Sequence, residues 1–144
     1  MARSGRRRIL LAGAAALVVP AARAQPQRQS ARVGIVFNTL ALGAVGGERP
    51  REPLMREFLL GLRDDGWVEG RNIVIERRSA EGKLDRLESI VRELSQLPVD
   101  VIVVSGNAAT LAAKKATSTV PIVSSGMANP VETGIVSSLA HPGG

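Results

Sequence analysis

Apolar residues follow two alternating patterns along this 144-residue chain. Short runs rich in Val and Ile, typical of buried strands, occupy residues 33–37, 73–75, 101–104 and 120–123. The segments between them predict helices, from apolar spacings of three and four in residues 53–65 and 84–97 and from a run of alanines in residues 108–117. This alternation favours the α/β class, with an open parallel sheet of about four strands and flanking helices.

The strand at residues 101–104 is expected to lie at the centre of the sheet, because four consecutive β-branched residues suit a strand buried on both faces. Each helix is expected to bury one apolar stripe against that sheet. In the second helix, Asp85 and Glu88 have the spacing of a capping box. The two predicted stripes consist of Leu54, Met55, Phe58, Leu59 and Leu62, and of Leu84, Leu87, Val91 and Leu94.

Two segments outside these elements also give expectations. Residues 40–51 combine a Gly-Gly pair with Pro50 and predict a long mobile loop after the first strand. Asn129, Pro130 and Glu132 have the local chemistry of a helix start. Residues 141–144 have a turn composition, which gives the expectation of a chain that is cut off.

The first 24 residues have the pattern of an export signal. A basic region over residues 3–8 precedes eleven apolar residues at 9–19 and a small-x-small cleavage site at Ala22-Arg23-Ala24. Eleven apolar residues are too few to span a bilayer, which takes ~20, so an uncleaved anchor is disfavoured. We expect a signal peptide over residues 1–24, of the Sec or the twin-arginine kind, a flexible leader over 25–31 and the folded part over 32–144.

The net charge of +6 is misleading, since five of the 19 basic residues lie in that signal. From Gln25 onward, 14 basic residues face 13 acidic ones, which removes the electrostatic case for a nucleic-acid partner. The chain has no cysteine, so disulfides, thiolate chemistry and a lipid-anchored cysteine are excluded. No segment after the signal is long and apolar enough to span a membrane.

Uncharged polar residues gather at three predicted strand ends. In the common strand order 2-1-3-4, the carboxyl ends of strands one, three and four lie side by side, and ligands of open α/β sheets bind at that edge. Hydroxyls, an amide and helix-start N–H groups can hold a carboxylate or another small polar ligand there. The same residue types are also common in turns and caps. The polar strand ends consist of Asn38, Thr39, Ser105, Gly106, Asn107, Ser124, Ser125 and Gly126, and all of these except Ser124 are the candidates for ligand binding.

The sequence carries no strong catalytic or cofactor signature. His141 is the single histidine, and neither a Gly-x-Gly-x-x-Gly turn nor a P-loop is present. We therefore predict no catalytic residue, metal site or cofactor. The alternative is a small α/β enzyme or flavodoxin-like domain that uses the turn at residues 105–107 as a nucleophile or phosphate site, and it requires a base near Ser105. A sensor domain would require a DNA-binding helix pair or a membrane helix.

Five runs of sequence resemble, in the same order, the TrpX-like substrate-binding proteins of ABC transporters, which are periplasmic binding proteins with a type I fold. The runs are GWVEGRNI at 66–73, AEGKLDRL at 80–87, VDVIV at 99–103, TVPIV at 119–123 and NPVETGIV at 129–136. The resemblance departs from the family at Asn129, where an Asp is usual. It covers the chain from its signal to its end.

The resemblance implies one of two α/β lobes that close on a small organic solute, often an amino acid. It further implies a periplasmic protein that is not an enzyme and that delivers its solute to ABC permease subunits in the inner membrane. The turns at residues 105–108 and 125–129 would hold the ligand, which adds Ala108 and Asn129 to the candidates. Because the family has longer chains, we expect a truncated first lobe, which binds weakly since closure between lobes desolvates the ligand.

Overall fold

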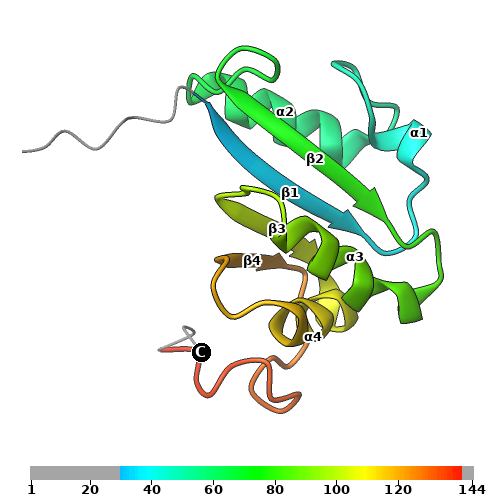
Figure 1. Cartoon of the computed structure of the whole chain (residues 1–144), viewed down its shortest axis with the longest axis vertical. Helices are drawn as coiled ribbons and strands as arrows, with labels where there is room; N and C mark the ends of the chain where they lie inside the picture. Colours follow the sequence, from blue (N-terminus) through cyan, green and yellow to red (C-terminus); the bar gives the residue numbers. More distant parts are fainter. Residues whose placement is uncertain (1–29, 141–144) are drawn as a thin grey trace, which may run out of the picture.

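Four parallel strands in the order β2-β1-β3-β4 form the sheet (Figure 1). They are β1 at Ala31–Phe37, β2 at Ile73–Ser79, β3 at Val101–Ser105 and β4 at Ile122–Ser125. The computed structural model describes residues 30–140, so the expected signal peptide, most of the leader and His141 lie outside the described residues. The predicted fold class and strand order are confirmed, with β1 and β3 as the two central strands.

Helices cover both faces of the sheet. They are α1 at Leu42–Val45, α2 at Pro53–Asp64, a single 3₁₀ turn η1 at Leu84–Arg86, α3 at Leu87–Ser95 and α4 at Gly106–Ala116. Because side chains alternate along a strand, Val33 and Ile35 of β1 pack with Met55 of α2 on one face, while Val36 packs with α3 on the other. No helix within residues 30–140 has the length and apolar character to cross a bilayer.

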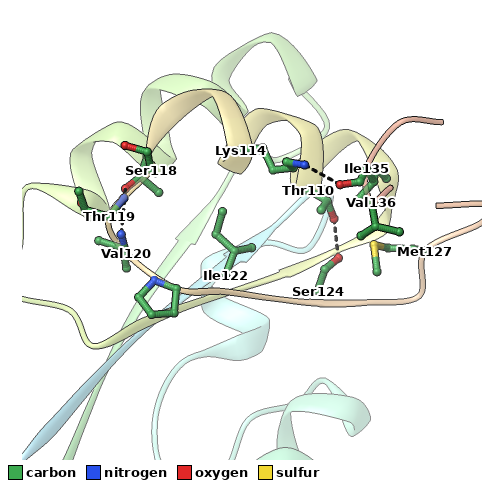
Figure 2. Close-up of a pocket in the computed structure, with 12 residues that line it drawn as sticks. Thr110, Lys114, Ser118, Thr119, Val120, Ile122, Ser124, Met127, Ile135 and Val136 are labelled. Carbon is green, nitrogen blue, oxygen red and sulfur yellow. Dashed lines mark hydrogen bonds between the residues drawn. The ribbon is translucent and has the colours of Figure 1, made fainter. Parts of the chain in front are cut away.

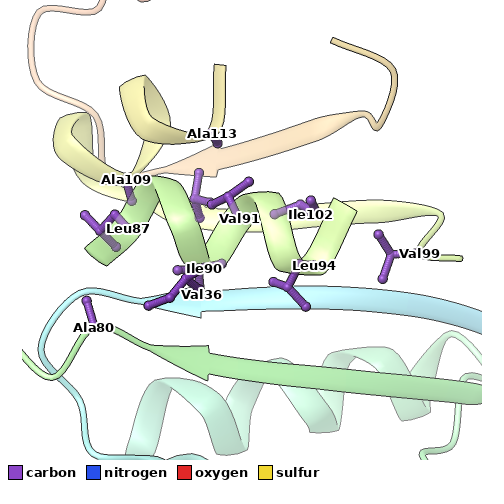
Figure 3. Close-up of a cluster of buried hydrophobic side chains, with 11 residues drawn as sticks. Val36, Ala80, Leu87, Ile90, Val91, Leu94, Val99, Ile102, Ala109 and Ala113 are labelled. Carbon is purple, nitrogen blue, oxygen red and sulfur yellow. The ribbon is translucent and has the colours of Figure 1, made fainter. Parts of the chain in front are cut away.

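The larger core lies between the sheet and the pair α3 and α4, as Figure 3 shows. Leu87, Val91 and Leu94 of α3 are almost completely buried, and so is Ile102 of β3. Helix α4 contributes Ala109 and Ala113, whose short side chains allow this helix to lie close to α3. The predicted stripe of α3 is confirmed at these positions, but Ile90 completes it in place of Leu84, which is 49% exposed.

Gly34 of β1 lets α3 approach the sheet. A Cβ at this position would lie 3.2 Å from Cδ1 of Leu94 and 3.4 Å from Cγ1 of Ile102. A methyl group there would force Leu94 to shift by a few tenths of an ångström, because protein interiors are packed too densely to absorb an added group without movement. The glycine is therefore required by packing rather than by backbone conformation.

Residues 40–51 and Leu54 of α2 differ from the sequence-based prediction in their burial. Residues 40–51 are not simply a mobile loop: they contain α1, whose Val45 is completely buried in the core cluster that also holds Met55 of α2 and Ile75 of β2. The amide of Glu52 donates to the carbonyl of Ala44 at 3.0 Å and ties the end of this segment to α1. On α2 the buried residue is Met55, and Leu54 is 79% exposed, so its assignment to the core was wrong.

The predicted helix after β4 is absent. Asn129 has φ +43 and Gly134 has φ +69, and the amides of Ile135 and Val136 both donate to the carbonyl of Pro130. Residues 129–136 therefore form successive turns, because an N-cap needs extended backbone and Asn129 is left-handed. Burial of Ile135 fixes these turns against the helical layer.

The capping box and several boundaries also differ from expectation. Asp85 lies in η1 whereas Glu88 lies in α3, and Glu88 accepts a bond from Arg92 at 2.6 Å instead of capping the helix. Helix α4 begins at Gly106, two residues earlier than predicted, and β2 runs on to Ser79. Strand β3 buries Ile102 and Val104, but Val101 and Val103 are only half-buried, so burial on both faces is incomplete.

The Gly34 contact gives a test of the core. We expect Gly34→Ala to lower the free energy of unfolding by about 1–3 kcal/mol, since Leu94 must move to admit the methyl group. The matched control is Gly61→Ala in α2, where no atom lies within 4 Å of the added Cβ. That control is expected to raise the stability by about 0.5–1 kcal/mol, because alanine favours a helix. Urea unfolding measures the free energy of unfolding of both variants. Equal effects of the two substitutions would refute the requirement for glycine at position 34.

Candidate ligand site at the carboxyl edge of the sheet

The ends of β1, β3 and β4 meet as the sequence predicts. In the parallel register, Val36 pairs with Val104 and Ser105 pairs with Ser125, so the residues after these strands emerge side by side. The amide nitrogen of Asn38 donates to the carbonyl of Ser105 at 3.0 Å and joins the end of β1 to the end of β3. This contact fixes the spacing of the first two polar ends.

Two glycines allow the backbone to bend sharply at this edge. Gly106 has φ +78 and Gly126 has φ +62, in the left-handed region where other residues are strained. A Cβ on Gly106 would lie 3.7 Å from Nδ2 of Asn38, and one on Gly126 would lie 3.6 Å from Oγ of Ser105. Both turns therefore lie directly beside polar side chains of the predicted site.

Asn107 connects the start of α4 to the segment after β4. Its Nδ2 donates to the carbonyl of Ala128 at 2.8 Å, and its Oδ1 accepts from the amide of Ala128 at 2.9 Å. The side-chain amide thus makes the same two hydrogen bonds that a backbone peptide group would make, and it joins two residues that are 21 apart in the sequence. This bond pair sets the position of the loop that carries Gly126 and Asn129.

The remaining candidates present free polar groups to solvent. Thr39, Ser105 and Ser125 are exposed, and within residues 30–140 their hydroxyls make no hydrogen bond. Ala108 is exposed in the first turn of α4, whose leading N–H groups have no partner within the helix. Asn129 is exposed just beyond Ala128. The edge is therefore a shelf of uncharged donors and acceptors, defined by the nine candidate residues and open to a ligand.

Asn38 differs from the other candidates because its side chain faces inward. Its Oδ1 is inaccessible to solvent and makes no hydrogen bond within the described part of the chain. Its backbone carbonyl accepts from the amide of Gly82 at 2.8 Å, which attaches the loop before η1 to the same edge. The role that the structure supports for Asn38 is to position β1, β3 and this loop.

A cavity, here called the flank cavity, lies elsewhere, beside β4. Its volume is about 670 Å³, and it lies between α4 and β4 with Ile135 and Val136 at one end (Figure 2). None of the nine candidates lines it. Its polar groups already bind one another: Nζ of Lys114 donates to the carbonyl of Ile135 at 2.6 Å, and the hydroxyl of Thr117 accepts from the amide of Val120 at 3.2 Å.

The sequence placed Ser124 among the polar strand ends but did not predict that its hydroxyl pairs with Thr110. Oγ1 of the buried Thr110 lies 2.5 Å from Oγ of Ser124 and donates to the carbonyl of Gly106 at 2.7 Å. This pair joins α4 to β4 directly behind Gly106. The available signals were the four-residue spacing from Gly106 to Thr110 and the alternation that turns Ser124 toward α4.

The described residues offer no group of three or more His, Asp or Glu side chains that could hold a metal ion. The shelf itself is uncharged, and no acidic or basic side chain of the described residues bonds to Ser105. Its side chains and leading N–H groups can donate and accept hydrogen bonds with a polar solute.

Comparison with known proteins identifies the family. The family of ABC transporter substrate binding proteins matches residues 52–144, which is more than half of the chain. The chain belongs to this family. The resemblance read from the five sequence runs is therefore confirmed for the substrate-binding proteins of ABC transporters.

Individual relatives of this substrate-binding protein agree with that assignment. The tyrosine-binding protein of Clostridioides difficile is 33% identical over 87 residues, which are 60% of this chain and 25% of that protein. A conserved domain protein from Vibrio cholerae has 27% identity and a TM-score of 0.64, covering 79% of this chain and 36% of its own. A ligand-free, open substrate binding protein with adhesive properties from Clostridium difficile has 25% identity and a TM-score of 0.61, covering 76% and 35%.

The fold extends to a more distant structure. The ABC domain from Streptococcus pneumonia in complex with L-Trp has a TM-score of 0.63 at 19% identity, covering 80% of this chain and 36% of that one. At that identity the likeness concerns the fold alone. The chain spans about a quarter to a third of the length of these relatives.

The Asn107 bond pair can be tested directly. We expect Asn107→Ala to release the loop after β4 and to speed hydrogen exchange of the Ala128 amide by ~5-fold, which corresponds to the loss of about 1 kcal/mol of hydrogen bonding. Val131→Ala, an exposed position in the following turn, serves as the control. Unchanged exchange at Ala128 in Asn107→Ala would show that the loop is held by other contacts.

Proposed function

We propose that this chain is the ligand-binding lobe of the solute-binding component of an ABC-type importer. It binds a small organic solute, such as an amino acid, on the shelf at the carboxyl ends of β1, β3 and β4. The observation that carries this proposal is the meeting of three uncharged strand ends, with free hydroxyls, in a member of the substrate-binding protein family. In open α/β sheets this edge is the usual position of a ligand.

The chemistry of the shelf suits the two charged groups of an amino acid. The leading N–H groups of α4 and the hydroxyls of Ser105 and Ser125 can donate to a carboxylate, which the helix dipole favours at this end. The same hydroxyl oxygens can accept from an ammonium group. One relative supports this ligand class, since it is named as a tyrosine-binding protein.

Location and partners follow from the same proposal. The export pattern of residues 1–24 and the family assignment support a periplasmic protein that hands its solute to permease subunits in the inner membrane. The balanced charge after Gln25 supports a small solute rather than a nucleic acid as its partner. No catalytic step is part of this function.

The enzyme alternative has less support than the binding function. Nucleophilic use of Ser105 requires a base within hydrogen-bond reach, and the contacts of Ser105 within residues 30–140 include none. A flavodoxin-like phosphate site would likewise rest on the turn at residues 105–107 alone, without a further phosphate-binding motif. The family match favours solute binding over both.

Isothermal titration tests the proposed function. The purified protein, shown first to melt cooperatively, is titrated with L-tyrosine, L-tryptophan, other amino acids and small carboxylates. We expect saturable but weak binding of at least one amino acid, because a single lobe leaves one side of the ligand in water. Cooperative melting without saturable binding of any compound would contradict the proposal.

Two serine substitutions separate the shelf from the flank cavity. We expect Ser105→Ala to weaken the binding of the best amino acid by about 10- to 100-fold, the value of one hydrogen bond to a charged group, with no change in melting temperature. Ser118→Ala changes an exposed hydroxyl in the wall of the flank cavity and is expected to have no effect on binding. Weaker binding in Ser118→Ala together with unchanged binding in Ser105→Ala would show that the ligand binds in the flank cavity.

A further inference from the structure

The loop after β2 brings a strained residue to the same edge of the sheet as the shelf. Glu81 has φ +50, in the left-handed region that residues with long side chains seldom adopt. Among residues 30–140, the other non-glycine residue with a positive φ is Asn129, which belongs to the shelf. Strained backbone is common where a protein holds a ligand, so the position of Glu81 calls for a functional reason.

Hydrogen bonds on both sides hold Glu81 in this conformation. The amide of Glu81 donates to Oγ of Ser79 at 3.0 Å, and this buried hydroxyl donates in turn to the carbonyl of Leu40 at 2.5 Å. The next amide, that of Gly82, donates to the carbonyl of Asn38 at 2.8 Å. The backbone around Glu81 is thus tied to the turn that follows β1.

Glu81 brings a negative charge to an otherwise uncharged edge. Its side chain is exposed and makes no ion pair or hydrogen bond within residues 30–140. On the neighbouring strand end, Oδ1 of Asn38 also accepts no hydrogen bond in the described part of the chain. The β1 and β2 half of the edge therefore has acceptors without donors, whereas the first turn of α4 offers N–H donors in the other half.

This polarity matches the two charged groups of an α-amino acid. Strand β1 separates β2 from β3, so the ends of β2 and β3 lie about 10 Å apart at a strand spacing of ~4.8 Å. Two charge-assisted hydrogen bonds of about 2.8 Å each, the ligand atoms between them and the side chain of Glu81 together span that distance. The carboxylate then lies at the start of α4, where the helix dipole favours it. The ammonium group lies over the end of β1, on the side of Glu81.

We propose that Glu81 binds the ammonium group of the amino-acid ligand. This role rests on the proposed function, since it assigns one charged group of the same solute. The hydroxyls of Ser105 and Ser125 are then available for the carboxylate. The site discriminates against a carboxylic acid of the same shape, because such a compound lacks the ammonium group and brings a second negative charge next to Glu81.

Paired titrations of the purified protein test this assignment. The probes are L-tyrosine, or whichever amino acid binds the unmodified protein best, and the same compound without its amino group. We expect Glu81→Gln, which keeps the size of the side chain and removes its charge, to weaken amino-acid binding by about tenfold without weakening the deaminated probe. The matched control is Glu57→Gln at an exposed position of α2, which leaves both affinities unchanged.

A second variant separates binding from folding. Because glycine adopts a positive φ without strain, we expect Glu81→Gly to keep or raise the melting temperature and still to weaken amino-acid binding as Glu81→Gln does. Unchanged amino-acid binding in either folded variant, or equal weakening of both probes, would overturn the role of Glu81 alone. An unmodified protein that melts cooperatively and binds no amino acid would overturn the proposed function together with it.

Discussion

The parallel ladder between β1 and β3 is the contact on which the rest of the structure depends. Its register pairs residues 33–36 with residues 101–104 and aligns the ends of both strands, which lets Asn38 reach the carbonyl of Ser105. Helix α3 packs against this ladder, and Gly34 leaves the space that Leu94 occupies. The packing of α3 on β1 thus helps to hold the two strands whose ends carry the shelf. Asn38, the first shelf residue, lies four residues after Gly34.

Most of the architecture could be predicted because it is recorded in local patterns. The β-branched runs specify the strands, the spacing of apolar residues specifies α2 and α3, and the order of elements limits the topology to very few choices. The failures occur where distant contacts override local chemistry. Asn129 and Pro130 have the composition of a helix start, but Ile135 is buried against α4 and the turns follow from that burial. Likewise, α1 forms because Val45 is buried in the core cluster with Met55 and Ile75.

The site was predictable in position but not in detail. Strand ends in an open sheet fall on one edge whatever their side chains are, so seven candidates could be placed there from the sequence and two more from the family resemblance. Which polar groups are free could not be predicted, since this depends on partners far away in the chain. The side-chain amides of Asn38 and Asn107 donate to the backbone carbonyls of Ser105 and Ala128. The hydroxyls of Ser105 and Ser125 remain free to bind a ligand. The supporting pair of Thr110 and Ser124 depends on the same long-range geometry.

The central claim is that the shelf, rather than the flank cavity, receives the solute. Amide chemical-shift mapping during a titration with L-tyrosine tests it most directly, because shelf and cavity share no residue. The account predicts saturable shifts at residues 105–108 and at Ser125 and Gly126, with little change at residues 117–122. Saturable shifts confined to residues 117–122, or to Ile135 and Val136, would contradict it.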